Sequence, residues 1–437
     1  AASDVYKRQD MYQIDGPLDM TVFFGFCGIK GYNHLRYPEA HPHSPWSMLE
    51  LKRTPETNIF DMIREKDLLI HLPYESFDES VVNFLYSAAN DKDVLAIKQT
   101  LYRVSSSSPV VQALEKAVQN GKQVTVLMEV KARFDEANNI LMARRLEKAG
   151  AHVIYGLVGL KTHSKCTLVI RREKDGIRRY VHVATGNYNA STAKLYTDLG
   201  ILTCNDRFGI DASAFFNLLS GYSDPPIWDS FIVAPINLRQ RCIELIDREI
   251  HFAKNGEDAH MIAKMNSLLD KGIIEKLYEA SQAGVKIELI VRGICVLIPG
   301  IPGVSDNITV RSIVGRFLEH SRIFWFRNGG REELYISSAD WMPRNLNDRV
   351  ELMVPIEDPE IKRRLKQMVD IELSDNQKAH IMQADGTWLK TISAENQLCA
   401  QEYFQKIAEK RDAEDEMTLA QKLEPYTPVL GHGDGSD

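Results

Sequence analysis

Residues 163–170 read His-Ser-Lys-Cys-Thr-Leu-Val-Ile, and residues 320–326 read His-Ser-Arg-Ile-Phe-Trp-Phe. Each stretch is a His-x-basic tripeptide that opens an apolar run typical of a β-strand. Because side chains two residues apart in a strand point to the same face, each tripeptide places an imidazole beside a cation. Neutral imidazole is a nucleophile at pH 7, and a neighbouring cation stabilises negative charge on the group it attacks. Two such faces meeting across a cleft would suit phosphoryl chemistry.

The two stretches belong to a longer internal repeat. Residues 121–127, Gly-Lys-Gln-Val-Thr-Val-Leu, resemble residues 284–290, Gly-Val-Lys-Ile-Glu-Leu-Ile, at an offset of 284 − 121 = 163. The two histidines are offset by 320 − 163 = 157. An interval of 13 residues separates two further pairs: Thr185 and Asp198, Ser338 and Glu351. The near-constant offset indicates a duplication, and each copy has the size of a small α/β domain.

The composition is that of an ordinary soluble globular protein. The chain has 437 residues, with 44% hydrophobic and 26% charged residues, which favours two to four domains. It contains neither an apolar run long enough to cross a membrane nor a secretory signal. Its six cysteines form no CxxC pair and no metal-binding spacing, so we expect reduced thiols and a cytoplasmic setting.

The charge is unevenly distributed. The net charge is −7, yet the segment from Lys98 to Arg179 contains 16 Lys and Arg against 7 Asp and Glu, a local excess of 16 − 7 = +9. An acidic protein with a basic segment usually handles an anionic substrate. The alternative is a set of solvated helix faces, which would account for Arg144, Arg145 and Lys148.

The pattern predicts an α/β fold with two tandem domains. Prolines near residues 38–45 and the Ser-Asp-Pro-Pro turn at 223–226 suggest the boundaries. We expect residues 1–45 to be the remnant of a preceding head domain, followed by a first catalytic domain over 46–226, a second domain over 227–400 and a charged C-terminal tail over 401–437.

Within the first repeat, the predicted order is strand, helix, strand, helix and three strands. Its segments are 94–101, 110–119 after a Ser-Pro helix start, 124–130, 137–148, 152–155, 165–170 and 180–184. In the second repeat we expect strands at 260–265, 286–291, 308–312, 323–326 and 334–337, a helix over 268–282, and a closing helix over 359–373. The Pro-Gly loop at 299–303 would border the cleft.

His163 is the sharpest candidate for a catalytic group. Lys165 is in phase with it, the element recurs, and Thr185-Gly186-Asn187 follows at a strand end, where small and amide residues can donate hydrogen bonds to a phosphoryl oxygen. Asp198 or Glu351 would orient a histidine in the correct tautomer. The alternative for both carboxylates is a surface salt bridge.

Three arginines follow predicted strands directly. Arg103, Arg133 and Arg292 stand at the carboxyl ends of strands, where α/β sheets bind ligands, and the arginine fork matches phosphate geometry. Tyr196 could stack on a base or bind a phosphate, although such a tyrosine is more often a packing residue. No P-loop and no set of metal-ligating residues is evident, so a divalent ion would arrive on the substrate phosphates.

Taken together, these motifs resemble the first family of polyphosphate kinases over roughly residues 10–375. The blocks that carry the resemblance are residues 14–18, 71–77, 96–103, 131–136, 162–165 and 185–189. The resemblance implies two tandem phospholipase D-like domains, with mixed sheets flanked by helices. It also implies reversible transfer of the ATP γ-phosphate to inorganic polyphosphate, with Mg²⁺ as cofactor. The expected partners are ATP or ADP and polyphosphate, without nucleic acid or an integral membrane segment.

The resemblance assigns roles residue by residue. His163 would become phosphorylated, and His320 would be the second histidine of the cleft, near the phosphates. Tyr196 and Arg292 match residues that contact ATP, and Arg103 and Arg133 match the magnesium-phosphate site. Because arginine has no lone pair to give to a metal, we expect those two to clamp metal-bound phosphates. The family also implies a homo-oligomer for the full-length protein, either free in the cytoplasm or peripheral at the inner membrane.

Two other functions stay open at this point. A phospholipase D-like phosphodiesterase would also use two histidines on a duplicated fold. Such enzymes carry an acid five residues after the motif lysine, where this chain has Ile170, and a second lysine where it has Arg322. A non-catalytic polyanion-binding fragment is the other possibility, because most of the preceding family domains are absent from this sequence. Its binding would fall steeply with salt and survive loss of His163.

Overall fold

The computed structural model describes residues 15–16, 18–49, 57–105, 107–130, 136–157, 159–221 and 227–423. The predicted turn at 223–226 and the predicted site residue Arg133 lie outside these ranges. The chain divides into two units, residues 1–41 and residues 42–437. Within the first unit the described part forms short helical turns with no buried side chains, at Met20–Val22 (η1), Phe23–Phe26 (α2) and Asn33–Leu35 (η2).

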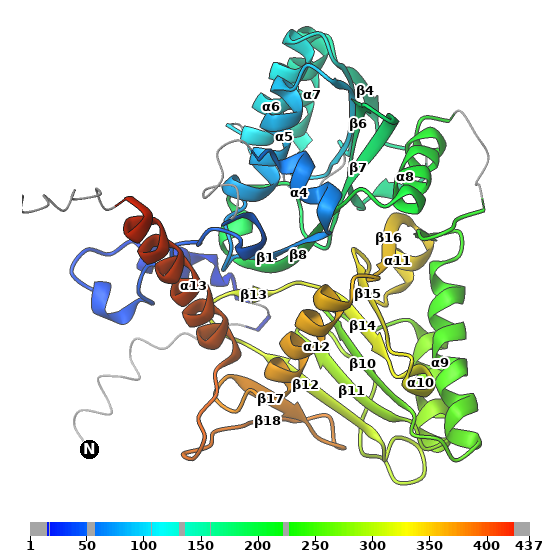
Figure 1. Cartoon of the computed structure of the whole chain (residues 1–437). Coiled ribbons are helices and arrows are strands. Elements are labelled where there is room, and N and C mark those ends of the chain that lie inside the picture. Colours follow the sequence, from blue (N-terminus) through cyan, green and yellow to red (C-terminus); the bar gives the residue numbers. More distant parts are fainter. Residues whose placement is uncertain are drawn as a thin grey trace, which may run out of the picture. The chain divides into compact units, whose positions relative to one another are not determined.

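The larger unit contains both sequence repeats, each built around a mixed β-sheet (Figure 1). In the first sheet the strand order is β1-β8-β7-β6-β2-β3-β4. Its strands are Leu68–Leu72 (β1), Val94–Leu101 (β2), Gln123–Met128 (β3), His152–Tyr155 (β4), Lys165–Glu173 (β6), Gly176–Ala184 (β7) and Tyr196–Thr203 (β8). Strands β2, β3 and β4 are parallel, and the remaining pairs of this order are antiparallel.

The second sheet repeats this arrangement strand by strand. Its order runs β9-β16-β15-β14-β10-β11-β12, with a hairpin of β17 and β18 added beside β12. The strands are Ile232–Ala234 (β9), His260–Met265 (β10), Lys286–Val291 (β11), Ile308–Ile313 (β12), Ile323–Phe326 (β14), Glu333–Ser337 (β15), Arg349–Pro355 (β16), Ala379–Met382 (β17) and Trp388–Lys390 (β18). Corresponding pairs have the same parallel or antiparallel sense in both sheets. The predicted duplication and the predicted pair of mixed α/β domains are confirmed.

Helices flank both sheets, as expected for phospholipase D-like domains. In the first repeat, α5 to α7 lie on one side of the sheet and α8 on the other (Figure 1). The helices of this repeat are Ile59–Glu65 (α4), Asn83–Asn90 (α5), Pro109–Gln119 (α6), Glu136–Ala149 (α7) and Asp206–Leu219 (α8), with shorter turns at Trp46–Met48 (η3), Asp78–Val82 (η4) and Thr192–Lys194 (η5). Helix α6 begins as predicted, because Ser108 accepts a hydrogen bond from the Val111 amide and Pro109 occupies the first turn.

The second sheet is covered on both faces in a way that its residue alternation explains. Along β11, Leu289 and Val291 join the core under α9 and α10, whereas Ile290 between them packs with Leu373 of α12. The helices are Leu238–Lys254 (α9), Lys271–Gln282 (α10), Pro343–Asn347 (α11), Pro359–Leu373 (α12) and Ala400–Leu423 (α13), and Asn328–Gly330 forms a short turn (η6). The closing helix α12 has the predicted bounds.

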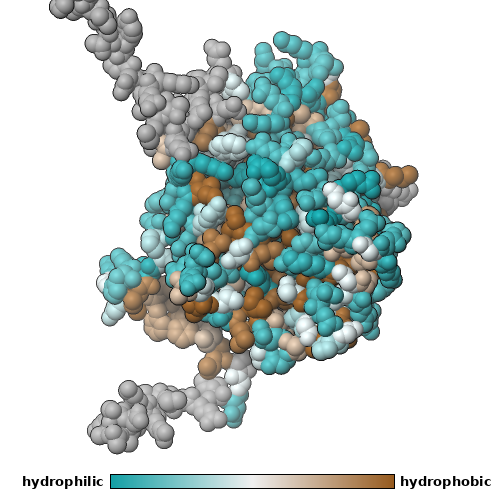
Figure 2. Space-filling view, turned by 60° about the horizontal axis from the view of Figure 1, so that its bottom comes forward, coloured by the Kyte–Doolittle hydropathy of each residue, from teal (hydrophilic) through white to brown (hydrophobic). Residues whose placement is uncertain are grey.

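Two sequence expectations need correction. The sequence predicts a charged tail over residues 401–437, yet α13 is a helix over Ala400–Leu423, and Phe404 is buried against His71 and Tyr74. The loop at 299–303 is present, but the Gly303 carbonyl accepts from Gln282 at the far end of α10, away from the histidines. Figure 2 shows one face of the molecule, on which hydrophilic side chains surround patches of apolar ones.

Candidate phosphoryl-transfer site

Two short strands are exchanged between the repeats, and each leads directly into a histidine. Lys161–Thr162 (β5), from the first repeat, pairs in parallel with β16 of the second sheet. Leu318–Glu319 (β13), from the second repeat, pairs in parallel with β8 of the first sheet. His163 and His320 are the next residues in the chain. The exchange therefore carries each histidine to the sheet of the other repeat.

His163 is held by a carboxylate of the second repeat. Its backbone N–H donates to the Val350 carbonyl at 2.9 Å, and its Nδ1 lies 2.9 Å from Oε2 of Glu351. Glu351 is fully buried and also accepts from the Ser338 hydroxyl at 2.5 Å. Because an ionised carboxylate only accepts hydrogen bonds, Nδ1 of His163 carries the proton and Nε2 keeps its lone pair.

His320 has the reciprocal arrangement with the first repeat. Its Nδ1 lies 2.8 Å and 2.9 Å from the two oxygens of Asp198, and Asp198 accepts from the Thr185 hydroxyl at 2.6 Å. The 13-residue interval seen twice in the sequence is thus the spacing of a hydroxyl and the carboxylate that it orients. Both carboxylates are buried, so the prediction that Asp198 and Glu351 orient histidines is confirmed, and the surface salt-bridge alternative is wrong.

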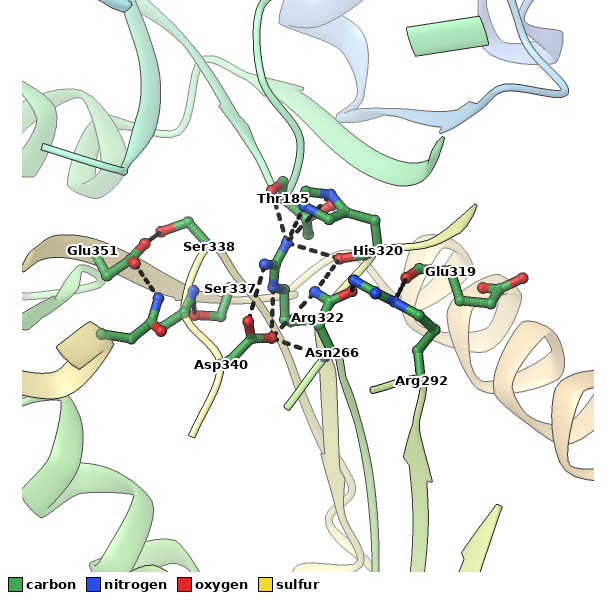
Figure 3. Close-up of polar contacts among 12 residues, drawn as sticks. Thr185, Asn266, Arg292, Glu319, His320, Arg322, Ser337, Ser338, Asp340 and Glu351 are labelled. Atoms are coloured by element: carbon green, nitrogen blue, oxygen red, sulfur yellow. Dashed lines mark hydrogen bonds and ion pairs between the residues drawn. The ribbon is translucent and has the colours of Figure 1, made fainter. Parts of the chain in front are cut away.

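The cations of the two tripeptides lie beside the histidines, but both are deeply buried. Lys165 opens β6, and its amine donates to the backbone carbonyl of His163. Arg322 forms an ion pair with Asp340, at 3.1 Å, and donates to the Thr185 carbonyl of the other repeat at 3.3 Å (Figure 3). Its Nη1 is 3.3 Å from both ring nitrogens of His320, which places it over the ring face.

Burial sets the protonation of this cluster. Burial, reinforced by Lys165 and Arg349, holds the pKa of His163 well below its usual value, so the imidazole is neutral at pH 7. Burial also lowers the pKa of Lys165, to about 7, although the Glu351 carboxylate opposes the shift. The pKa of Glu351 is raised by burial, against the effect of Lys165.

Burial and a neighbouring carboxylate also set the protonation of His320. Burial lowers the pKa of His320, and the carboxylate of Asp198 partly offsets this effect. For Asp198, burial alone would raise the pKa, but His320 and the Thr185 hydroxyl outweigh it and hold the pKa below its usual value. In the ground state both histidines are therefore neutral imidazoles, and the Nδ1–H group of each donates a hydrogen bond to a carboxylate.

Comparison with known proteins assigns this arrangement to a family. Residues 58–225 match the family model described as polyphosphate kinase C-terminal domain 1, and residues 231–401 match that of polyphosphate kinase C-terminal domain 2. The chain belongs to the polyphosphate kinase family. The resemblance inferred from the sequence is confirmed.

Individual members of the family agree with this assignment. The chain is 56% identical to a polyphosphate kinase of Halalkalibacterium halodurans over 374 residues, 85% of this chain and 52% of that protein. It is 50% identical to one of Synechocystis sp. over 421 residues, 92% of this chain and 57% of that protein. The crystal structure of polyphosphate kinase from Porphyromonas gingivalis aligns with a TM-score of 0.79 and 38% identity, over 87% of this chain and 57% of that chain. The chain spans about half the length of these polyphosphate kinases.

Three further residues predicted for the site lie near the histidines: Tyr196, Arg292 and Arg103. The Tyr196 ring lies 5.2 Å from that of His320. Arg292 donates to the Glu319 carbonyl at 3.1 Å and to Asn266 at 2.9 Å (Figure 3). Arg103 follows β2, with its guanidinium 5.8 Å from the Tyr102 ring, which itself meets the His163 ring edge-on at 5.1 Å. Arg133 lies outside the described residues, so its placement stays a prediction.

Sequence reasoning missed several residues that complete this site. Tyr102, Asn266 and Asp340 each contact a histidine or its neighbouring cation, and Asn345 donates to Glu351. One signal could have found Asp340, because it follows Ser338 by two residues, as Asn187 follows Thr185. Tyr102 and Asn266 carry no such signal, since only the folded sheets bring them to the histidines.

Nothing in the described part of the chain resembles an all-protein metal site. No group of three or more His, Cys, Asp and Glu side chains that could hold an ion occurs there. The histidines lie beside the cations Lys165 and Arg322, which suit phosphate oxygens better than a metal ion, and the carboxylates Glu351 and Asp198 are engaged by the histidines themselves. The six cysteines, all within the described ranges, are free. No helix among the described residues is long and apolar enough to cross a membrane.

Proposed function

We propose that this chain carries the phosphoryl-transfer centre of a polyphosphate kinase, which reversibly transfers the γ-phosphate of ATP to inorganic polyphosphate through a phosphohistidine at His163. Family membership supports the substrates, because the relatives bear the name polyphosphate kinase. The observation that carries the mechanism is the bond between His163 Nδ1 and Glu351. It leaves Nε2 as the nucleophilic nitrogen of a neutral ring.

In the first half-reaction, the Nε2 lone pair of His163 attacks the γ-phosphorus in line. The bond from phosphorus to the bridging oxygen breaks, and ADP leaves with that electron pair. The imidazole becomes cationic, and Glu351 stabilises the positive charge through the Nδ1 proton, which stays in place. In the second half-reaction, a terminal phosphate oxygen of polyphosphate attacks the same phosphorus, and the N–P bond breaks to regenerate neutral His163.

The cations and the second histidine serve the transferring group. Lys165, Arg292 and Arg103 neutralise phosphoryl oxygens, for which arginine forks and a compact ammonium are suited. His320 lies next to Arg322 and Tyr196, where it exchanges a proton or a hydrogen bond with the phosphates through its Nε2. Tyr196 stacks on or hydrogen-bonds to the nucleotide.

Magnesium enters this scheme as part of the nucleotide substrate. The described residues offer no carboxylate cage for it, and Mg²⁺ commonly binds through substrate phosphates and water. Bound there, it would neutralise phosphate charge. Arg103, and Arg133 by the family resemblance, would contact the metal-bound phosphates and not the ion itself.

The test is to incubate the chain with γ-labelled ATP and Mg²⁺ and to measure acid-labile, base-stable label on the protein. We expect label on His163, at Nε2, and no label in His163→Ala. In His320→Ala we expect the fold to be retained and transfer to be slower. Retention of label in His163→Ala would refute the assignment. Hydrolysis of bis(p-nitrophenyl) phosphate without labelling would instead indicate a phosphodiesterase, and salt-sensitive polyphosphate binding alone a binding fragment.

A further inference from the structure

The side chain of Gln401, on helix α13, is buried against the segment that contains the exchanged strand β13. The side chain is 3% exposed. Its Oε1 accepts from the Phe317 amide at 3.0 Å, and its Nε2 donates to the Phe317 carbonyl at 2.9 Å and to Oε1 of Glu319 at 2.6 Å. One carboxamide therefore satisfies three groups on the segment that leads into His320.

Glu319 is fixed from two further sides. Its Oε2 accepts from the Thr197 hydroxyl of β8 at 2.8 Å and from the Lys264 amine of β10 at 2.7 Å. Lys264 also contacts Glu372 of α12. All of these groups are buried. Among the described residues, β13 is thus held by polar contacts from β8, β10 and α13. Glu372 of α12 fixes Lys264 in turn, and Gln401 supplies the contact from α13.

The position of β13 decides where the groups around His320 lie. Leu318 and Glu319 pair with Tyr196 and Thr197 of β8. The His320 amide donates to the Thr197 hydroxyl at 3.2 Å. The Glu319 carbonyl accepts from Arg292 (Figure 3). A shift of β13 would therefore move His320 and Arg292 together and would leave His163, which is anchored on β16, in place.

A glycine makes the approach of Gln401 possible. A Cβ at Gly315 would overlap with Oε1 of Gln401 and lie 2.9 Å from its Cδ. That distance is below any ordinary van der Waals contact, so a side chain at residue 315 would displace the carboxamide. Gly315 and Gln401 can consequently be perturbed independently, from opposite sides of the same contact.

We propose that Gln401 is a positioning residue for phosphoryl transfer: its carboxamide fixes β13 so that His320 stays against Asp198 while Arg292 faces the same point. Gln401 touches no substrate in this scheme and acts only through the strand. The catalytic consequence rests on the function proposed above, whereas the structural consequence for His320 does not.

The first measurement is NMR of the chain labelled with ¹⁵N in histidine. Buried Nδ1–H groups bonded to Glu351 and Asp198 are sheltered from exchange, and His163→Gln and His320→Gln assign their signals. In Gln401→Met, which keeps the side-chain volume without its polar atoms, we expect the His320 signal to shift or disappear and the His163 signal to stay. Gln405→Met, one turn along α13, is the matched control and should move neither signal.

The second measurement keeps the proposal testable if Gln401→Met folds poorly. Gly315→Ala should move the His320 signal in the same way. The double variant Gly315→Ala/Gln401→Ala should be no worse than Gln401→Ala alone, because alanine at 401 removes the displaced amide. Additive effects of the two substitutions, or equal movement of both histidine signals, would overturn the proposal.

The rate of polyphosphate synthesis is a third measurement, independent of the NMR signals. In Gln401→Met we expect kcat for polyphosphate synthesis to fall about 10- to 100-fold, with little change in KM. A loss of this size is expected when catalytic groups such as His320 are displaced by up to about one ångström. An unchanged kcat would refute the catalytic consequence. If even the unaltered chain transfers no phosphate, the proposed function fails, while the histidine signals still decide whether Gln401 positions His320.

Discussion

Nδ1 of His163 lies 2.9 Å from Oε2 of Glu351, although 188 residues separate the two in the chain. His320 and Asp198 repeat the relationship in the opposite direction. Each histidine is therefore oriented by a carboxylate of the other repeat. Neither repeat on its own supplies both members of either pair, so each histidine–carboxylate contact requires both domains.

Glu351→Gln should abolish most of the phosphorylation of His163 while the fold is kept. The amide is nearly isosteric, but it no longer selects the tautomer with Nδ1 protonated or stabilises the imidazolium. When a base-orienting aspartate becomes asparagine, the loss is on the order of 10⁴-fold. The rate of label transfer from ATP measures it. Glu357→Gln, at a partly exposed carboxylate that pairs with Arg207, is the control and should change the rate little. Full labelling of Glu351→Gln would contradict the role given to Glu351.

Gly186→Ala should disturb the second pair sterically. A Cβ at residue 186 would overlap with the Asp198 carboxylate and lie 2.7 Å from its Cβ. Asp198 would be pushed away from Thr185 and His320, and such overpacking costs about 1–3 kcal/mol. Urea unfolding and the rate of polyphosphate synthesis measure the two effects. Gly25→Ala meets no atom within 4 Å and should be neutral. A Gly186→Ala protein with unaltered stability would show that Asp198 can move without cost.

Deprotonation of Lys165 should cause the fall in kcat/KM on the alkaline side of the pH profile. Its pKa is lowered to about 7 by burial, so in the free protein the ammonium is lost as pH rises through about 7, and kcat/KM should fall there. The acid side should lie well below pH 6.5, because His163 must be neutral and its pKa is depressed. In Lys165→Arg the guanidinium stays charged, so the alkaline fall should disappear even though the maximal rate drops. An alkaline limb that persists in Lys165→Arg belongs to another group.

The lowered pKa of Lys165 also predicts how the free energy of unfolding depends on pH. Its folded pKa lies below its unfolded value of 10.5, so the unfolded chain binds more protons between about pH 7 and 10.5. Its contribution to the free energy of unfolding should therefore rise with pH across that window. Urea titrations of the unaltered chain and of Lys165→Met should diverge in slope between these pH values. Parallel curves would show that Lys165 keeps its ordinary pKa.

Arg322→Met should destabilise the protein by about 3–5 kcal/mol, because it leaves the Asp340 carboxylate buried without its cation. The double variant Arg322→Met/Asp340→Asn should recover part of that loss, which urea unfolding can measure.

In the unaltered chain the pKa of Asp340 is about 2, because the effect of burial, which raises the pKa, is outweighed by that of Arg322, which lowers it. Stability from this carboxylate is therefore present above pH 3.8 and lost as pH falls toward 2. If Arg322→Met and Arg322→Met/Asp340→Asn were equally stable, the unpaired Asp340 carboxylate would carry no cost in the free energy of unfolding, which would contradict this account of the ion pair.

The elements around the site could be predicted from sequence to a large extent. Strands β10, β11 and β14 and helix α12 have the predicted bounds, since apolar runs and an Asp-Pro helix start are local signals. The duplication was visible in the spacing of glycines and histidines. The two-residue strands β5 and β13 were not, because a strand that short has no periodicity and exists only through its partner in the other sheet.

The same limit explains what was misjudged about α13. Its many charged residues are typical of a solvated tail, although its buried residues, Ala400, Phe404 and Ala408, follow one another at a helical spacing of four. Its burial depends on a few side chains, of which Gln401 bonds β13 and Phe404 meets His71 and Tyr74. No pattern along residues 400–423 indicates those distant partners.

The sequence by itself determined the repeated α/β elements, the identity of the two histidines and the hydroxyl–carboxylate spacing, because each depends on residues close together in the chain. Only the tertiary structure decided which carboxylate serves which histidine. The pairing crosses between the repeats because β5 of the first repeat joins the second sheet and β13 of the second repeat joins the first sheet. Hydrogen bonding between strands so far apart in sequence exists only in the folded chain. Burial at that junction then sets the protonation of His163 and Lys165, which no local sequence encodes.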